Sequence, residues 1–122
     1  MTDKTREKVD FSGLVAGLAT SAVAVLAQVE QLLDTGRAFD MASGEESEPL
    51  PRDEVRKRVA DGLGGARQLI DTLSMLEEKT KGNLTDEERE LLQSATSELR
   101  IRFVSLSNRP VPEKTEEEGK SA

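Results

Sequence analysis

The feature that most constrains this fold is an uncharged stretch from Phe11 to Ala27 near the start of the chain. Its apolar residues recur at helical spacing and continue in the same pattern as far as Leu33. Gly36 follows, and glycine commonly ends helices. We therefore predict a helix over residues 11–35. Because it is apolar almost all round, other helices or a partner must cover it.

A stretch of this kind could also be a membrane span or a signal peptide. It is short for a span, at about 17 residues, and rich in Ala, Gly, Ser and Thr. Asp3, Glu7 and Asp10 interrupt the basic segment that a secretory signal would need. The sequence favours a buried helix of a cytoplasmic protein, with an interfacial or exported segment as the alternative.

A second helical pattern covers residues 53–81. Gly62, Gly64 and Gly65 lie inside it, and each glycine costs a helix interior about 1 kcal/mol relative to alanine. The pattern therefore predicts a break near residues 61–65, with a continuous helix as the alternative.

A third helix is predicted over residues 85–107, directly after a strong stop signal. Gly82 and Asn83 are residue types that end helices, and Thr85 with Glu88 forms a capping-box pattern. So short a connection between two helices makes them antiparallel neighbours. The second and third helices should therefore form an αα-hairpin.

The remaining segments are polar. Residues 37–52 mix Gly, Ser, Pro and Glu and are predicted to be a flexible acidic linker, and residues 1–9 and 108–122 to be disordered tails. The predicted fold is all-α: a single domain over residues 10–107, with a long N-terminal helix packed on a C-terminal αα-hairpin.

The composition argues against several functions. The chain has no Cys and no His, which removes the commonest nucleophile–base pairs and zinc sites, so we expect no enzyme activity, no cofactor and no metal. With 24 acidic and 17 basic residues, its net charge of −7 disfavours nucleic acid as a partner. We expect no membrane partner either.

Small residues in the first helix suggest an interaction surface. Gly13 and Gly17 form a GxxxG pattern, and a second small-residue stripe passes through Ala16, Thr20 and Ala24. This surface could pack on the chain's own hairpin or on a second copy. A helix that is apolar almost all round needs cover on more sides than one hairpin supplies, so we favour a homo-oligomer seam made of Gly13, Leu14, Gly17, Leu18 and Ser21.

Three charged features have simpler interpretations. Asp71 could be a catalytic carboxylate, but it lacks a second titrating partner and fits a solvated helix face. The acids at 77–78 and 86–88 lack the ligand spacing of a calcium loop. Basic residues near the hairpin lack the aromatic neighbours typical of nucleic-acid sites; they are Lys79, Lys81, Arg100 and Arg102.

The stretch 66–85, with Ile-Asp-Thr-Leu-Ser-Met-Leu followed by Lys-Thr-Lys-Gly-Asn-Leu-Thr, strongly resembles the bacterial domain of unknown function 1844. Residues 10–22 resemble that family's opening and residues 99–104 its close. The resemblance implies a small cytosolic helical protein and transfers no catalytic residue. Residues 37–61 depart from the family pattern as an apparent insertion, which leaves the placement of Val55 and Val59 open.

Three functions follow as hypotheses. The first is a non-enzymatic module that homo-oligomerises through its first helix and binds another protein. The second is an accessory factor of the translation machinery that touches ribosomal RNA through the basic residues near the hairpin. The third, which the sequence favours least, is an enzyme that uses carboxylates alone.

Overall fold

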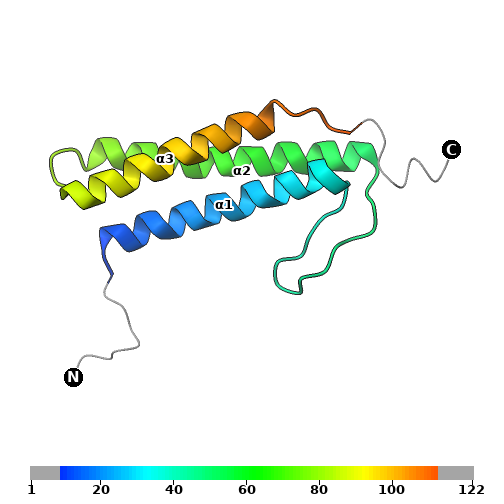
Figure 1. Cartoon of the computed structure of the whole chain (residues 1–122), viewed down its shortest axis with the longest axis horizontal. Helices are drawn as coiled ribbons and strands as arrows, with labels where there is room; N and C mark the ends of the chain where they lie inside the picture. The colour runs from blue at the N-terminus through cyan, green and yellow to red at the C-terminus, as the bar shows by residue number, and fades with distance from the viewer. Residues whose placement is uncertain (1–8, 113–122) are drawn as a thin grey trace, which may run out of the picture.

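The computed structural model describes residues 9–112, and it contains three α-helices: α1 (Phe11–Thr35), α2 (Arg52–Lys79) and α3 (Asp86–Ser107). Each helix packs against both others, with α2 and α3 forming an antiparallel hairpin and α1 lying along it (Figure 1). The predicted all-α fold, a long first helix on a C-terminal αα-hairpin, is confirmed. The predicted disorder of residues 1–8 and 113–122 falls outside the described residues.

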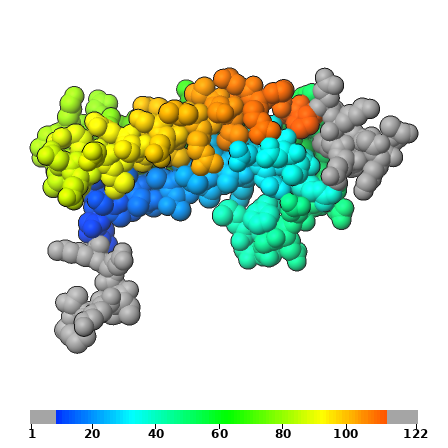
Figure 2. Space-filling view, in the orientation of Figure 1, coloured from blue at the N-terminus to red at the C-terminus, as the bar shows by residue number. Residues whose placement is uncertain are grey.

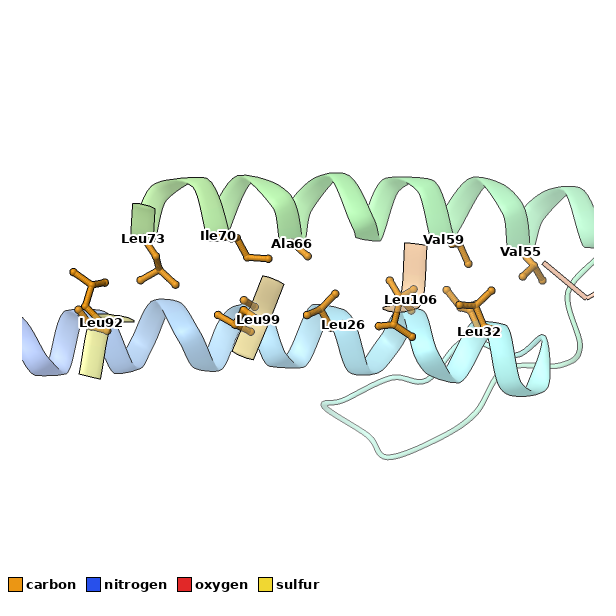
Figure 3. Close-up of a cluster of buried hydrophobic side chains, with 14 residues drawn as sticks. Leu26, Leu32, Val55, Val59, Ala66, Ile70, Leu73, Leu92, Leu99 and Leu106 are labelled. Carbon is orange, nitrogen blue, oxygen red and sulfur yellow. The ribbon is translucent and has the colours of Figure 1, made fainter. Parts of the chain in front are cut away.

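Leu, Val, Ile and Ala fill the seam where the three helices meet. Figure 3 shows side chains of α2 pointing toward α1, with leucines of α3 along the same seam. The buried apolar residues are Val15, Ala22, Leu26, Val29, Leu32, Leu33, Val55, Val59, Ala66, Ile70, Leu73, Leu92, Leu99 and Leu106. Val55 and Val59, whose placement the sequence left open, therefore belong to the core.

The predicted break near residues 61–65 is absent, because α2 runs without interruption from Arg52 to Lys79. The reason lies in its packing on α1. A Cβ atom at Gly62 would lie 2.6 Å from Cγ2 of Val29, a distance too short for any side chain. Glycine at position 62 thus lets α1 approach closely, and tertiary packing outweighs the low helix propensity of three glycines.

Local hydrogen bonds define the helix ends. The Asp10 carboxylate accepts a hydrogen bond from Gly13 N–H at 2.7 Å and caps the start of α1. At the other end, Gly36 follows the last helical residue and adopts a left-handed φ of 70°. Gly82, at φ 86°, turns the chain between α2 and α3. The predicted capping box is present: Thr85 Oγ1 accepts from Glu88 N–H at 3.1 Å, and Glu88 Oε1 accepts from Thr85 N–H at 2.8 Å.

Thr85→Ala should lower the free energy of unfolding by about 1 kcal/mol, because it removes the acceptor for one free N–H at the start of α3. Urea denaturation followed by far-UV circular dichroism measures this. Ser94→Ala, at an exposed position inside α3, is the matched control and should change little. Equal midpoints for Thr85→Ala and the unmodified chain would show that the cap does not stabilise the hairpin.

The segment between α1 and α2 is a hydrogen-bonded loop. Its backbone pairs Asp40 N–H with the Glu45 carbonyl at 2.8 Å, and Phe39 and Glu46 form an isolated antiparallel bridge. Leu50 N–H donates to the Gly36 carbonyl at 2.9 Å and closes the loop at its base. The flexibility predicted for residues 37–52 remains a prediction, but the segment has a defined path.

The predicted C-terminal tail begins too early at residue 108. Arg109 pairs with Asp34 of α1 at 2.8 Å, Arg52 Nε donates to the Pro112 carbonyl at 2.9 Å, and Val111 packs against the core. Residues 109–112 therefore extend the packing beyond α3. Sequence composition missed this because the contacts join residues far apart in the chain.

Candidate functional site

Most of the predicted seam lies on the surface of α1 that faces away from the hairpin. Gly13, Gly17 and Ser21 are exposed, and Leu14 is 49% exposed despite its apolar side chain. At 100° per residue, Gly13 and Gly17 project opposite the buried face marked by Ala22. This part of α1 is therefore available to a partner.

Leu18 differs from the other predicted seam residues. Its side chain is half-buried and packs against the protein's own core. Leu18 lies between the buried and exposed faces of α1, so a partner would meet only its outer edge. The structure thus divides the predicted seam into four accessible residues and one that mainly serves the bundle.

The second stripe of small residues lies on the same outer surface. Ala16, Thr20 and Ala27 are exposed, and Ala24 is half-buried. A Cβ at Gly17 would meet nothing within 4 Å, so the glycine there is not needed by the packing of this chain. We call the exposed surface through these residues the α1 face: Gly13, Ala16, Gly17, Thr20, Ala24 and Ala27.

The loop after α1 forms a wall at one end of the α1 face, a feature that the sequence analysis missed. Phe39 is 39% exposed and Met41 is 58% exposed. They line an open apolar hollow of about 210 Å³ together with Ala24, Ala27, Gln28 and Gln31. Gln31 Nε2 donates to Glu46 Oε1 at 2.7 Å and ties the loop to α1. In Figure 2 the loop stands out from the bundle beside α1. Two large apolar residues close together in a mostly polar segment were the available signal.

By length and composition α1 could cross a membrane. Only 22% of its most apolar 18-residue window is buried in the protein. Core helices of soluble proteins and signal sequences have the same length and composition. These two properties therefore do not assign α1 to a membrane. The burial of its residues shows that the chain covers one face of α1 and leaves the opposite face exposed.

The predicted junction residues have structural roles. Gly82 provides the left-handed turn, and Asn83 N–H donates to the Thr80 carbonyl at 2.9 Å. Thr85 and Glu88 satisfy each other in the capping box. The adjoining hollow of about 550 Å³ is open and lined by charges of both signs, including Glu77, Glu78, Lys81 and Arg89. Such a mixed lining does not favour one charged ligand.

The charged candidates lie on solvated surfaces. Asp71 is 69% exposed and lies 3.9 Å from Arg67, an i,i+4 surface pair. Within residues 9–112, no three acidic side chains are grouped closely enough to hold a metal ion. Asp71 is therefore a solvated surface carboxylate beside one basic residue.

The four basic residues are divided between two parts of the hairpin. Lys79 and Lys81 lie exposed at the α2–α3 junction, whereas Arg100 lies within α3 and hydrogen-bonds Ser74 of α2. Arg102 is half-buried. Arg102 is therefore less accessible than the other three basic residues.

The family model for a domain of unknown function (DUF1844) matches residues 8–105, which is most of the chain and includes all three helices except the last two residues of α3. No curated protein matches the chain, and no solved structure matches it.

Proposed function

Because the chain belongs to the DUF1844 family, whose model carries no assigned activity, we propose from the surface of this chain that it is a non-enzymatic protein–protein interaction module. It homo-oligomerises through the α1 face. The proposal assigns the chain no cofactor and no catalytic residue, and it places the protein in the cytoplasm.

The observation that carries this proposal is the low coverage of α1. The helix has no charged residue from Phe11 to Val29, yet only 22% of its most apolar window is buried. A soluble monomer normally turns a polar helix face toward water. Here the exposed positions up to Gln28 are mostly glycine, alanine, serine and threonine, with Leu14 and Val23 among them, so the α1 face fits contact with another surface.

The residue types on this face favour a helix over lipid as its occupant. Glycine and alanine expose little apolar side-chain area to lipid, but they allow two helix backbones to approach closely. Gly17 illustrates this, since nothing in its own chain lies within 4 Å of the position that a Cβ would take. Close approach of a partner helix would explain a glycine at position 17, whereas the packing of this chain does not require one.

Gly17→Leu should dissociate the oligomer. Its side chain would separate the paired backbones, and overpacking of this kind costs about 1–3 kcal/mol per site, acting on both copies at a two-fold axis. We expect the dissociation constant to rise at least about tenfold. Sedimentation equilibrium across a range of protein concentrations measures the change.

Gly64→Leu is the matched control. Gly64 is an exposed helical glycine of α2 with nothing within 4 Å, so the same substitution there should leave the oligomer intact. Both variants should keep their helical circular dichroism, because leucine has the higher helix propensity. A concentration-independent mass of one chain for the unmodified protein would reject the proposal, and comigration with lipid vesicles would then identify a membrane as the cover of α1.

A further inference from the structure

We infer that the partner on the α1 face is a second copy lying antiparallel, with Val9 of each copy in the apolar hollow beside Phe39 and Met41 of the other. This inference rests on the proposed homo-oligomerisation and adds its orientation and contacts. It follows from the extent of the α1 face, the position of the hollow and the negative charge of the loop after α1.

The length of the α1 face indicates where a two-fold axis between the two copies would lie. The α1 face begins at Gly13 and ends at Ala27, where the wall of the loop starts, so its midpoint is Thr20. A two-fold axis at Thr20 would place Ala16 opposite Ala24 of the second copy and Gly13 opposite Ala27. Small residues of the two copies meet at these positions, and both copies use the same surface, which defines an isologous interface.

The same two-fold axis would bring residues of the second copy to the hollow beside Phe39 and Met41. Its α1 lining, from Ala24 to Gln31, would face residues 9–16 of the second copy. Val9 lies at this end and is 95% exposed in the single chain. Within one chain, about 22 Å of helix separates Val9 from the level of Ala24, at a rise of 1.5 Å per residue. Another copy can therefore bring a Val9 side chain to the hollow.

The negative charge of the loop after α1 favours an antiparallel pair of α1 helices over a parallel pair. Residues 37–51 contain four acids and one base: Asp40, Glu45, Glu46 and Glu48 against Arg37. A parallel pair would put two such loops side by side, and like charges at an interface are unfavourable. The antiparallel pair separates them.

In the antiparallel pair, each acidic loop also lies near the start of the other α1. The positive end of a helix dipole is there.

Disulfide trapping tests the orientation cleanly because the chain has no cysteine of its own. A disulfide needs Cα atoms about 4.4–6.8 Å apart. Thr20→Cys, at the axis, should form a covalent dimer. Val9→Cys and Met41→Cys should each stay monomeric on a non-reducing gel when oxidised alone, but should link to each other when the two variants are mixed. Ile101→Cys, 70% exposed on α3, measures collisional background.

The outcomes separate this inference from the proposed function. Linkage of Thr20→Cys together with the mixed Val9→Cys and Met41→Cys pair supports both. Self-linkage of Val9→Cys and of Met41→Cys would mean a parallel pair, which overturns the inference and leaves the proposed function standing. A chain that is dimeric in sedimentation but shows only background linkage at all three positions would place the interface elsewhere and overturn the inference. A monomer in sedimentation would overturn both.

Discussion

Leu92→Ala should lower the free energy of unfolding by about 2–5 kcal/mol, a large share of the stability of an ordinary small domain. Leu92 is completely buried on α3, near Leu73 of α2 in the core seam (Figure 3). The substitution removes apolar contacts and leaves a cavity that rigid neighbouring helices fill only in part. No aromatic side chain is buried there to take up the space.

Leu91→Ala is the matched control, since it makes the same substitution one position earlier on a side chain that is 38% exposed. Urea denaturation followed by far-UV circular dichroism suits a chain without Trp or Tyr, and a fixed protein concentration keeps any oligomer contribution constant. Similar losses for both variants would contradict the observed burial of Leu92.

Gly62→Leu should destabilise the fold, whereas Gly64→Leu should stabilise it slightly. Every side chain larger than glycine begins with a Cβ, which at position 62 would lie 2.6 Å from Val29 Cγ2. Val29 is buried, and a β-branched side chain in a helix has little rotameric freedom to move away. We expect Gly62→Leu to cost about 1–3 kcal/mol.

Position 64 supplies the control for this prediction. A Cβ there meets nothing within 4 Å, so Gly64→Leu should gain the difference in helix propensity, a little under about 1 kcal/mol. Thermal or urea denaturation of the two variants should therefore give shifts of opposite sign. Shifts of the same sign would show that helix propensity, and not the contact with α1, governs both positions.

The parts of the fold that depend on neighbouring residues could be predicted from the sequence. The start of α3 is an example, because Thr85 and Glu88 satisfy each other's backbone donors within one helical turn. The continuity of α2 could not, since it depends on the contact between Gly62 and Val29, two residues that no local pattern connects. The contacts of Arg109 and Pro112 were missed for the same reason.

The candidate site was only partly predictable for a related reason. An amphipathic helix reveals its outer face by its polar residues, but α1 has no charged residue over most of its length. Its sequence therefore identified Gly13 and Gly17 as a packing stripe without showing which face the hairpin covers. Leu18 was assigned to the seam although it mainly packs on the core, and the wall formed by Phe39 and Met41 was missed.

The hydrogen bond between Leu50 N–H and the Gly36 carbonyl has a consequence for how such a protein can change over evolution. This bond joins the two ends of the loop where α1 and α2 meet. Residues of the loop between Gly36 and Leu50 can therefore be gained or lost without moving either helix. Exposed loops accept such changes far more readily than packed helices do. An insertion at the exposed tip of this loop could therefore alter partner choice while every buried residue of the three helices stays the same.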